Sequence, residues 1–222
     1  MPVQVTAFKE IKEWLTQKGV QLVAVSKTKP VADIHELFNL GQREFGENYV
    51  QEMVEKQAQL PTDIRWHFIG HLQSNKVKFI APFVHLIHGV DSFKLLKEIN
   101  KQANKFNRVI DCLLQVHIAE EETKFGFDQQ ELTELFGLPE LEQQKNIRVI
   151  GFMGMASNSP DESKVRTEFK KLKSLLDKYT PEFSLSPAIL SMGMSGDYKL
   201  AIEEGSNMVR IGSLLFGERE KK

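Results

Sequence analysis

The sequence contains a single cysteine, Cys112, among its 222 residues. One cysteine cannot form an intrachain disulfide, and it excludes the paired-cysteine spacings that are typical of structural zinc sites. Apolar residues on both sides, including Ile110, Leu113 and Leu114, predict that Cys112 lies in the core. The sequence therefore indicates that this thiol has a packing role rather than a chemical one.

The sequence also lacks a long apolar run and an excess of charge of either sign. No segment approaches the ~20 consecutive apolar residues of a membrane span, and the N-terminal segment has acidic residues and no apolar stretch of the signal-peptide kind. With 29 basic and 30 acidic residues, the net charge is −1. That balance gives no electrostatic footprint for nucleic acid or for an anionic membrane. We expect a cytoplasmic protein that binds neither nucleic acid nor membranes.

No Pro/Gly/Ser-rich linker, low-complexity tract or internal repeat divides the chain. The hydrophobic fraction of 41% and the charged fraction of 27% are ordinary for a globular protein. A chain of this length buries enough surface for a full core without disulfide or metal support. We therefore expect a single domain over residues 1–222.

Short apolar runs alternate along the chain with segments of helical periodicity. The runs that we expect to form strands are 22–26, 43–45, 66–69, 84–90, 109–118, 148–152, 188–192 and 208–211. An additional helix is predicted over 7–18, before the first strand. Strands that alternate with helices pair in parallel, and eight such units in roughly 200 residues fit the lower size limit of a (β/α)8 TIM barrel. A doubly wound open sheet predicts the same alternation and stays the alternative.

The first expected strand runs into a lysine, Lys27. Side chains alternate along a strand, so Val23, Val25 and Lys27 share one face. On the inward face of a barrel, Lys27 would lie at the mouth, where the active sites of this fold gather. Desolvation there favours the neutral amine, which is the nucleophile toward a carbonyl. A surface lysine at the end of a strand is the alternative. Lys29 has the same parity but lies beyond the strand, next to a proline, and is the weaker candidate.

Two segments near the end of the sequence have the composition of an anion site. SMGMSGD at 191–197 follows the seventh expected strand and leads into a helix expected over 198–204, and RIGS at 210–213 ends the eighth strand. Small residues expose backbone N–H groups, and a helix N-terminus adds a partial positive charge. The loops after strands seven and eight often build phosphate sites in TIM barrels. Either loop alone could hold only turn and cap glycines, but the two together with Lys27 favour a phosphorylated ligand.

Four stretches carry a resemblance to a known family: AVSKTKP at 24–30, FGENYVQE at 45–52, WHFIGHLQSNK at 66–76, and LSMGMSGDYKLAIEEGSNMVRIGSLLFGER at 190–219. In these stretches the chain resembles the pyridoxal phosphate homeostasis protein family. The resemblance implies an α/β fold, a (β/α)8 TIM barrel of fold-type III that is similar to the barrel domain of alanine racemase. It also implies binding of pyridoxal 5′-phosphate (PLP) and a role in intracellular PLP homeostasis, with apo-forms of PLP-dependent enzymes as candidate recipients.

The cofactor-binding residues that the resemblance implies, position by position, are Lys27 for the internal aldimine, Asn48 beside the ring, Ser195, Gly212 and Ser213 for the phosphate, Arg210 facing the pyridine nitrogen, and Met194. His117 departs from the pattern, because the family would have a small amide such as Asn there. The resemblance therefore does not define the contacts on the strand-five side of the pocket.

The residue that faces the pyridine nitrogen decides which chemistry PLP supports. Arg210 is cationic and only donates hydrogen bonds, so it favours an unprotonated nitrogen. Carbanion stabilisation is then weak, which suits storage or racemisation better than transamination or decarboxylation. The first hypothesis is a PLP carrier that is not an efficient enzyme, and the alternative is an amino-acid racemase or a related fold-type III enzyme. A barrel enzyme that acts on a phosphorylated sugar through a lysine Schiff base is a third, weaker hypothesis.

Racemisation needs a second acid or base on the substrate face opposite Lys27. In the alanine racemases this is a tyrosine from an additional domain, and we expect no such domain here because the sequence ends soon after Ser213. Tyr49, next to Asn48, is the only tyrosine in a position to substitute. We therefore expect little or no racemase activity, and a monomer.

Three further side chains lie in the third matching stretch. His67 and His71 are expected to line the mouth. Their spacing would suit a metal site on a helix, but 66–69 is predicted to be a strand, so no metal site is expected. Lys76 could reach an anion near the mouth, and a plain surface position is the alternative.

Overall fold

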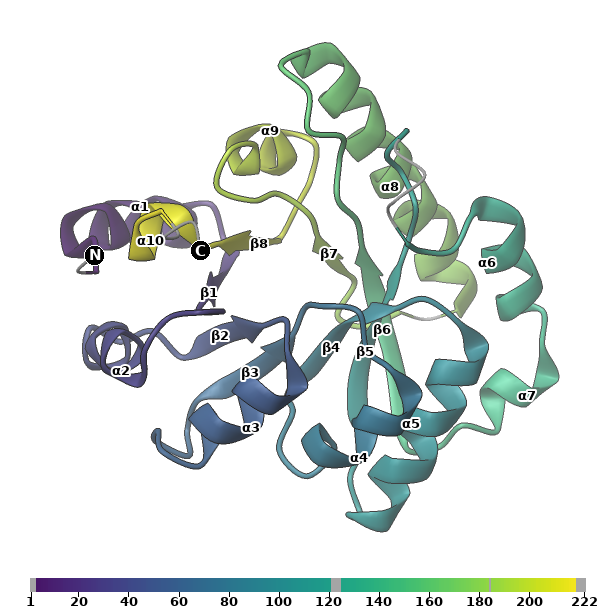
Figure 1. Ribbon diagram of the computed structural model, residues 1–222. Helices are drawn as coiled ribbons and strands as arrows, with labels where there is room; N and C mark the ends of the chain where they lie inside the picture. Colours follow the sequence, from purple (N-terminus) through teal and green to yellow (C-terminus); the bar gives the residue numbers. More distant parts are fainter. Residues whose placement is uncertain (1–2, 121–124, 184, 219–222) are drawn as a thin grey trace.

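The computed structural model describes residues 3–120, 125–183 and 185–218 (Figure 1). Within them, parallel strands close into a barrel in the order β1 to β8. The strands are β1 Gln21–Val25, β2 Glu44–Glu47, β3 Arg65–Phe68, β4 Leu86–Val90, β5 Ile110–Gln115, β6 Ile147–Met153, β7 Ile189–Ser191 and β8 Met208–Ile211. The (β/α)8 barrel predicted from the sequence is confirmed, and pairing of β1 with β8 excludes the open sheet.

The helices surround the barrel on its outside (Figure 1). They are α1 Val5–Gln17, α2 Val31–Asn39, α3 Val50–Gln57, α4 Val77–Ile80, α5 Phe93–Lys105, α6 Gln129–Phe136, α7 Pro139–Glu142, α8 Glu162–Phe183, α9 Tyr198–Glu203 and α10 Ser213–Phe216, with a 3-10 turn, η1, at Ser74–Lys76. The predicted additional helix before the first strand is α1. It lies beside α10, where Gln4 N donates to Leu215 O over 2.7 Å. Among the helices described, none is long and apolar enough to cross a membrane.

The apolar core has an outer and an inner part. The outer part lies between the strands and the helices and includes Phe45, Cys112 and Phe169, all of them fully buried. Burial raises the pKa of the Cys112 thiol, as the core position predicted from its neighbours requires. The inner part fills the barrel and is formed by Val23, Leu86, Leu113, Ile150, Met153 and Met208. Since the barrel is filled below, a ligand has room only where the strands end.

Candidate functional site

The C-terminal ends of the strands open on a cavity of about 290 Å³. This volume is close to the lower end of the range for small-molecule pockets, ~300–1,000 Å³. All seven predicted cofactor-binding residues line it, namely Lys27, Asn48, Met194, Ser195, Arg210, Gly212 and Ser213, and they are joined by Val25, Lys29, Ile69, Met155, Gly196 and Gly217. The structure therefore brings the predicted residues together, and their roles in binding stay a prediction.

Lys27 lies just beyond the end of β1 and is half-buried. Val23 belongs to the inner core and Val25 lines the cavity, so the inward face that the alternation predicts for Val23, Val25 and Lys27 is confirmed. β1 lies between β2 and β8 in the barrel. Lys27 is therefore placed next to the loop after β8, on the rim of the cavity.

A buried ionic cluster fixes the backbone just before Lys27. Ser26 Oγ donates to Glu47 Oε1 over 2.6 Å, and Lys56 Nζ donates to the carbonyl oxygen of Ser26 over 2.7 Å. Lys56 also pairs with Glu47 Oε1 at 2.8 Å. Burial raises the pKa of the Glu47 carboxyl, and the Lys56 ammonium opposes that rise. No local sequence pattern marked this cluster, because its members come from three separate segments.

The residue after Lys27 has a strained backbone. Thr28 has φ of 64°, a left-handed conformation that is unfavourable for a β-branched side chain. Such strain costs roughly 1–3 kcal/mol and persists only where the surroundings impose it. Here the Thr28 N–H donates to Glu52 Oε1 over 2.5 Å, and Glu52 is paired with Lys56 at 2.7 Å. The same cluster therefore holds the chain on both sides of Lys27.

Lys29, the weaker candidate for the reactive lysine, has a structural role. Its Nζ donates to the carbonyl oxygens of Phe216, Gly217 and Glu218 over 2.8, 3.4 and 3.5 Å. A lysine ammonium at the end of a helix satisfies carbonyl groups that the helix leaves unpaired. Lys29 is thus engaged in holding the end of α10.

The loops after β7 and β8 form a cradle of backbone N–H groups. Gly193 has φ of 97°, and a Cβ there would lie 2.7 Å from Ala201 Cβ, so the tight turn requires glycine. Ser195 Oγ accepts from Gly212 N over 3.3 Å and joins the two loops. Among the described residues, the backbone N–H groups of Ser195, Gly196 and Ser213 have no acceptor. Successive unpaired N–H groups in a concave turn suit an anion such as a phosphate.

Arg210 lies at the floor of the cavity, on β8, and is almost fully buried. Its Nη1 donates to the carbonyl oxygen and to Oγ of Ser191 over 2.8 and 2.7 Å, and its Nη2 donates to Gly154 O over 3.1 Å. Burial lowers the pKa of Arg210 to about 10, and the Asp197 carboxylate opposes the shift. Arg210 is therefore still a cation at neutral pH and offers only hydrogen-bond donors to the cavity.

Asn48 follows β2 and faces the cavity from the side of Lys27. Its Oδ1 is buried and has no hydrogen-bond partner within the part of the chain that the structure describes. An unpaired buried acceptor costs ~1–3 kcal/mol, and a ligand with a donor group in the cavity would supply the missing partner. Together with the N–H cradle, this orphan acceptor shows that the residues present fit a phosphorylated ligand such as PLP.

The histidines predicted at the mouth separate in the structure. His71 lies in the loop after β3 and lines a separate pocket beside α3 and η1 rather than the cavity of Lys27, and its Nδ1 pairs with Asp91 at 3.1 Å. His67 does not line the cavity either: it is fully buried within the barrel and contacts Glu44 and His88. The expectation for His67 is wrong because this residue lies inside β3 and its side chain points inward below Ile69, which lines the cavity.

The other predicted candidates lie outside this cavity. Tyr49 is 61% exposed and, with the exposed Lys76, lines a neighbouring pocket around α3 and η1. His117 is half-buried after β5, where its N–H donates to Phe127 O over 3.0 Å. None of these three side chains contributes to the cavity that holds Lys27.

Comparison with known proteins defines first the class of this barrel. The family described as "Alanine racemase, N-terminal domain" matches residues 6–220. Alanine racemase from Bartonella henselae, solved with covalently bound pyridoxal phosphate, has a TM-score of 0.73 and 19% identity, over 96% of this chain and 62% of that one. At this identity the similarity concerns the fold alone.

Nearer relatives then give the particular family. The "Pyridoxal phosphate homeostasis protein" of Aquifex aeolicus (strain VF5) is 44% identical over 201 residues, which are 90% of this chain and 87% of the relative. PipY of Synechococcus elongatus PCC7942 is 34% identical and has been solved without PLP and with PLP bound. The TM-scores are 0.89 and 0.85, over 96% and 95% of this chain and 99% and 100% of PipY. The chain belongs to the pyridoxal phosphate homeostasis protein family, which confirms the resemblance seen in the four stretches.

Proposed function

We propose that this protein binds PLP in the cavity at the C-terminal ends of the strands and acts in PLP homeostasis as a carrier of the cofactor. The observation that carries the proposal is one cavity that joins the lysine after β1, the N–H cradle after β7 and β8, and the buried Arg210. PipY, solved with PLP bound and of the same fold, supports it. When bound, PLP would supply an electrophilic aldehyde and an electron-withdrawing ring.

Each of the seven predicted cofactor-binding residues has a definite part in this proposal. Lys27 would offer its amine to the aldehyde, and the ionic cluster around Glu47 and Lys56 holds the backbone before it. Ser195 and Ser213, with Gly212, would bind the phosphate, and Met194, in the same loop as Ser195, would line the cavity beside it. Arg210 would donate to the pyridine nitrogen and so favour its unprotonated form, and Asn48 would lie on the side of the ring.

The small number of acidic and basic side chains in the cavity favours the carrier role over racemase activity. Among the described residues that line it, the ionisable side chains are Lys27, Lys29 and Arg210. Lys29 is engaged with α10, and Tyr49 lies outside the cavity. A proton donor on the face opposite Lys27 is therefore not supplied by these residues. We extend the proposal to a monomeric, single-domain, cytoplasmic protein that passes PLP to apo-forms of PLP-dependent enzymes.

The test is to load the purified protein with PLP, reduce it with borohydride and locate the pyridoxyl group by mass spectrometry. The proposal expects a visible absorbance band that borohydride removes and an adduct on the peptide that contains Lys27. Scattered labelling of surface lysines, with no defined band, would refute it. Formation of D-amino acids from L-amino acids at enzyme rates, on the order of 1 s⁻¹ or faster, would favour the racemase instead.

A further inference from the structure

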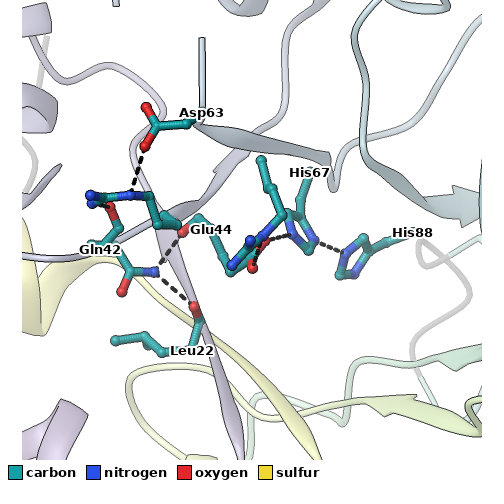
Figure 2. A network of polar contacts seen from close by, with 8 residues as sticks. Leu22, Gln42, Glu44, Asp63, His67 and His88 are labelled. Carbon is teal, nitrogen blue, oxygen red and sulfur yellow. Dashed lines mark hydrogen bonds and ion pairs between the residues drawn. The ribbon is translucent and has the colours of Figure 1, made fainter. Parts of the chain in front are cut away.

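A chain of hydrogen bonds crosses the barrel behind the cavity, from Arg210 to Glu44. Ser191 Oγ accepts from Arg210 Nη1 over 2.7 Å and lies 3.0 Å from His88 Nδ1. His88 Nε2 lies 2.8 Å from His67 Nδ1, and His67 Nε2 lies 2.7 Å from Glu44 Oε2. Figure 2 shows the part of the chain that joins Glu44, His67 and His88. All five side chains are buried.

The ends of the chain fix its direction. Arg210 can only donate, and an ionised Glu44 can only accept. With both imidazoles neutral, every bond is satisfied in one way: Ser191 donates to His88, His88 donates from Nε2 to His67, and His67 donates from Nε2 to Glu44. Each imidazole then carries its hydrogen on Nε2. Successive bonds of this kind polarise one another.

The far end of the chain contains three potential metal ligands. Glu44 begins β2, His67 lies in β3, and His85 comes directly before β4, so neighbouring strands bring them to the N-terminal end of the barrel. One ligand atom from each lies within 4.8 Å of the others. Glu44 and His67 are buried and His85 is exposed, which gives an ion a path from solvent. Two imidazoles and one carboxylate, with a position left open, are a donor set that suits Zn²⁺.

We propose that Glu44, His67 and His85 form a binding site for a divalent transition-metal ion of the zinc class, at the opposite end of the barrel from the cofactor cavity. His88 would hold the second nitrogen of His67, as partners outside the coordination sphere do in metal sites. Arg65 pairs with the other oxygen of Glu44 and opposes a cation, but its half-exposed side chain can turn toward solvent. The sequence-based argument against metal concerned His67 with His71, which the structure separates.

The chain connects this site with the cavity. A metal ion on His67 Nε2 requires the lone pair there, so the hydrogen of His67 moves to Nδ1, and that of His88 moves to Nδ1 in turn. Each imidazole keeps one hydrogen, and Ser191 keeps its hydroxyl hydrogen, which no longer points to His88. Ser191 then accepts from both His88 and Arg210. Metal binding therefore reverses the direction of the hydrogen-bond chain and changes the bonds made by Ser191, the partner of Arg210. Detecting this change through the absorbance of bound PLP rests on the proposed function.

The metal site is tested on the protein without PLP, prepared without a polyhistidine tag and freed of metal by a chelator. Zn²⁺ is titrated in competition with a chromophoric chelator. His85→Ala should weaken binding by about tenfold or more, the least effect seen when partners of metal ligands are lost, and Arg65→Gln should strengthen it. His35→Ala, an exposed histidine on α2, should leave the affinity unchanged. Equal affinities of the wild type and His85→Ala would overturn the site, and circular dichroism checks that each variant is folded.

The connection is tested on PLP-loaded protein after removal of free PLP, which itself chelates metals. Zn²⁺ should shift the visible band of the wild type, and Ser191→Ala should bind Zn²⁺ without that shift. Zn²⁺ binding with an unchanged band in the wild type would overturn the connection. If PLP fails to bind at all, the proposed function fails, while the titration without PLP still decides the metal site.

Discussion

The two sides of the cavity are formed by different chemical groups. On the side of β1 and β2, the contacts of Ser26 and Thr28 are made by charged side chains: Glu47 and Lys56, which are buried, and Glu52, which is half-buried. On the side of β7 and β8, glycines and backbone N–H groups form the wall, with Ser195 as the link between loops. Buried ion pairs resist disruption because separating one pair leaves an uncompensated charge in the interior. This difference fits the proposal that the first side positions the Lys27 amine and that the second binds the phosphate.

The sharpest test of this comparison is the choice between the two lysines of the cavity. Lys27→Ala should abolish the borohydride-reducible band and the pyridoxyl adduct, because the amine itself is lost. Lys29→Ala is the matched control, since it lines the same cavity but is engaged with α10. It should keep both signals. A band that survives in Lys27→Ala with the adduct on Lys29 would reverse the assignment.

Removal of the Lys56 ammonium should have the largest effect on stability. Lys56→Met leaves the fully buried Glu47 without its partner, at a cost of about 3–5 kcal/mol. Denaturant unfolding followed by circular dichroism measures this, and Lys9→Met, an exposed lysine on α1, serves as control.

Glu47→Gln in the Lys56→Met background separates charge from packing. If uncompensated charge causes the loss, the double variant should recover part of the stability. No recovery would mean that the ionic cluster on the β1–β2 side stabilises the protein through packing alone.

Two glycines of one loop sharpen the description of the opposite side. Gly193→Ala should destabilise the protein by roughly 1–3 kcal/mol, because φ is 97° and the new Cβ would meet Ala201. Gly196→Ala should change the free energy of unfolding by no more than ~0.5 kcal/mol, since a Cβ there has no neighbour within 4 Å. Equal losses in the two variants would contradict the assigned turn geometry.

The smallest effect is expected for the two serines of the cradle. Ser195→Ala and Ser213→Ala should each weaken PLP binding by about 1–2 kcal/mol, the cost of one hydrogen bond to a charged group. Fluorescence titration with PLP measures it. Pyridoxal, which lacks the phosphate, should bind the wild type more weakly and be indifferent to both changes. The same affinity for PLP and pyridoxal would refute phosphate binding by the cradle.

The parts of the site that depend on a short segment of sequence were predictable. Strand alternation gave the barrel, side-chain parity gave Lys27 its inward face, and small residues after two strands gave the cradle. The cluster around Glu47 and Lys56 was not predictable, because β2 was expected to end before Glu47. Gly46 and Glu47 have low strand propensity, and only pairing with β3 extends the strand through them.

The depth of a side chain inside the barrel was also beyond the sequence. Parity places His67 and Ile69 on the same inward face, but it does not say which of them reaches the cavity. That depends on the stagger of strands around the closed barrel. In the structure Ile69 lines the cavity and His67 contacts His88 in the layer below.

The conformation of Thr28 sets two selective pressures against each other. Asparagine or glycine adopts a positive φ more readily than a β-branched residue, so a screen for thermostability alone should enrich Thr28→Asn or Thr28→Gly. A stiff residue beside Lys27, however, restricts the positions that the lysine backbone can visit. A screen for retention of PLP should therefore keep threonine. The residue found at position 28 would then indicate whether a lineage or a laboratory library was selected for thermostability or for retention of PLP.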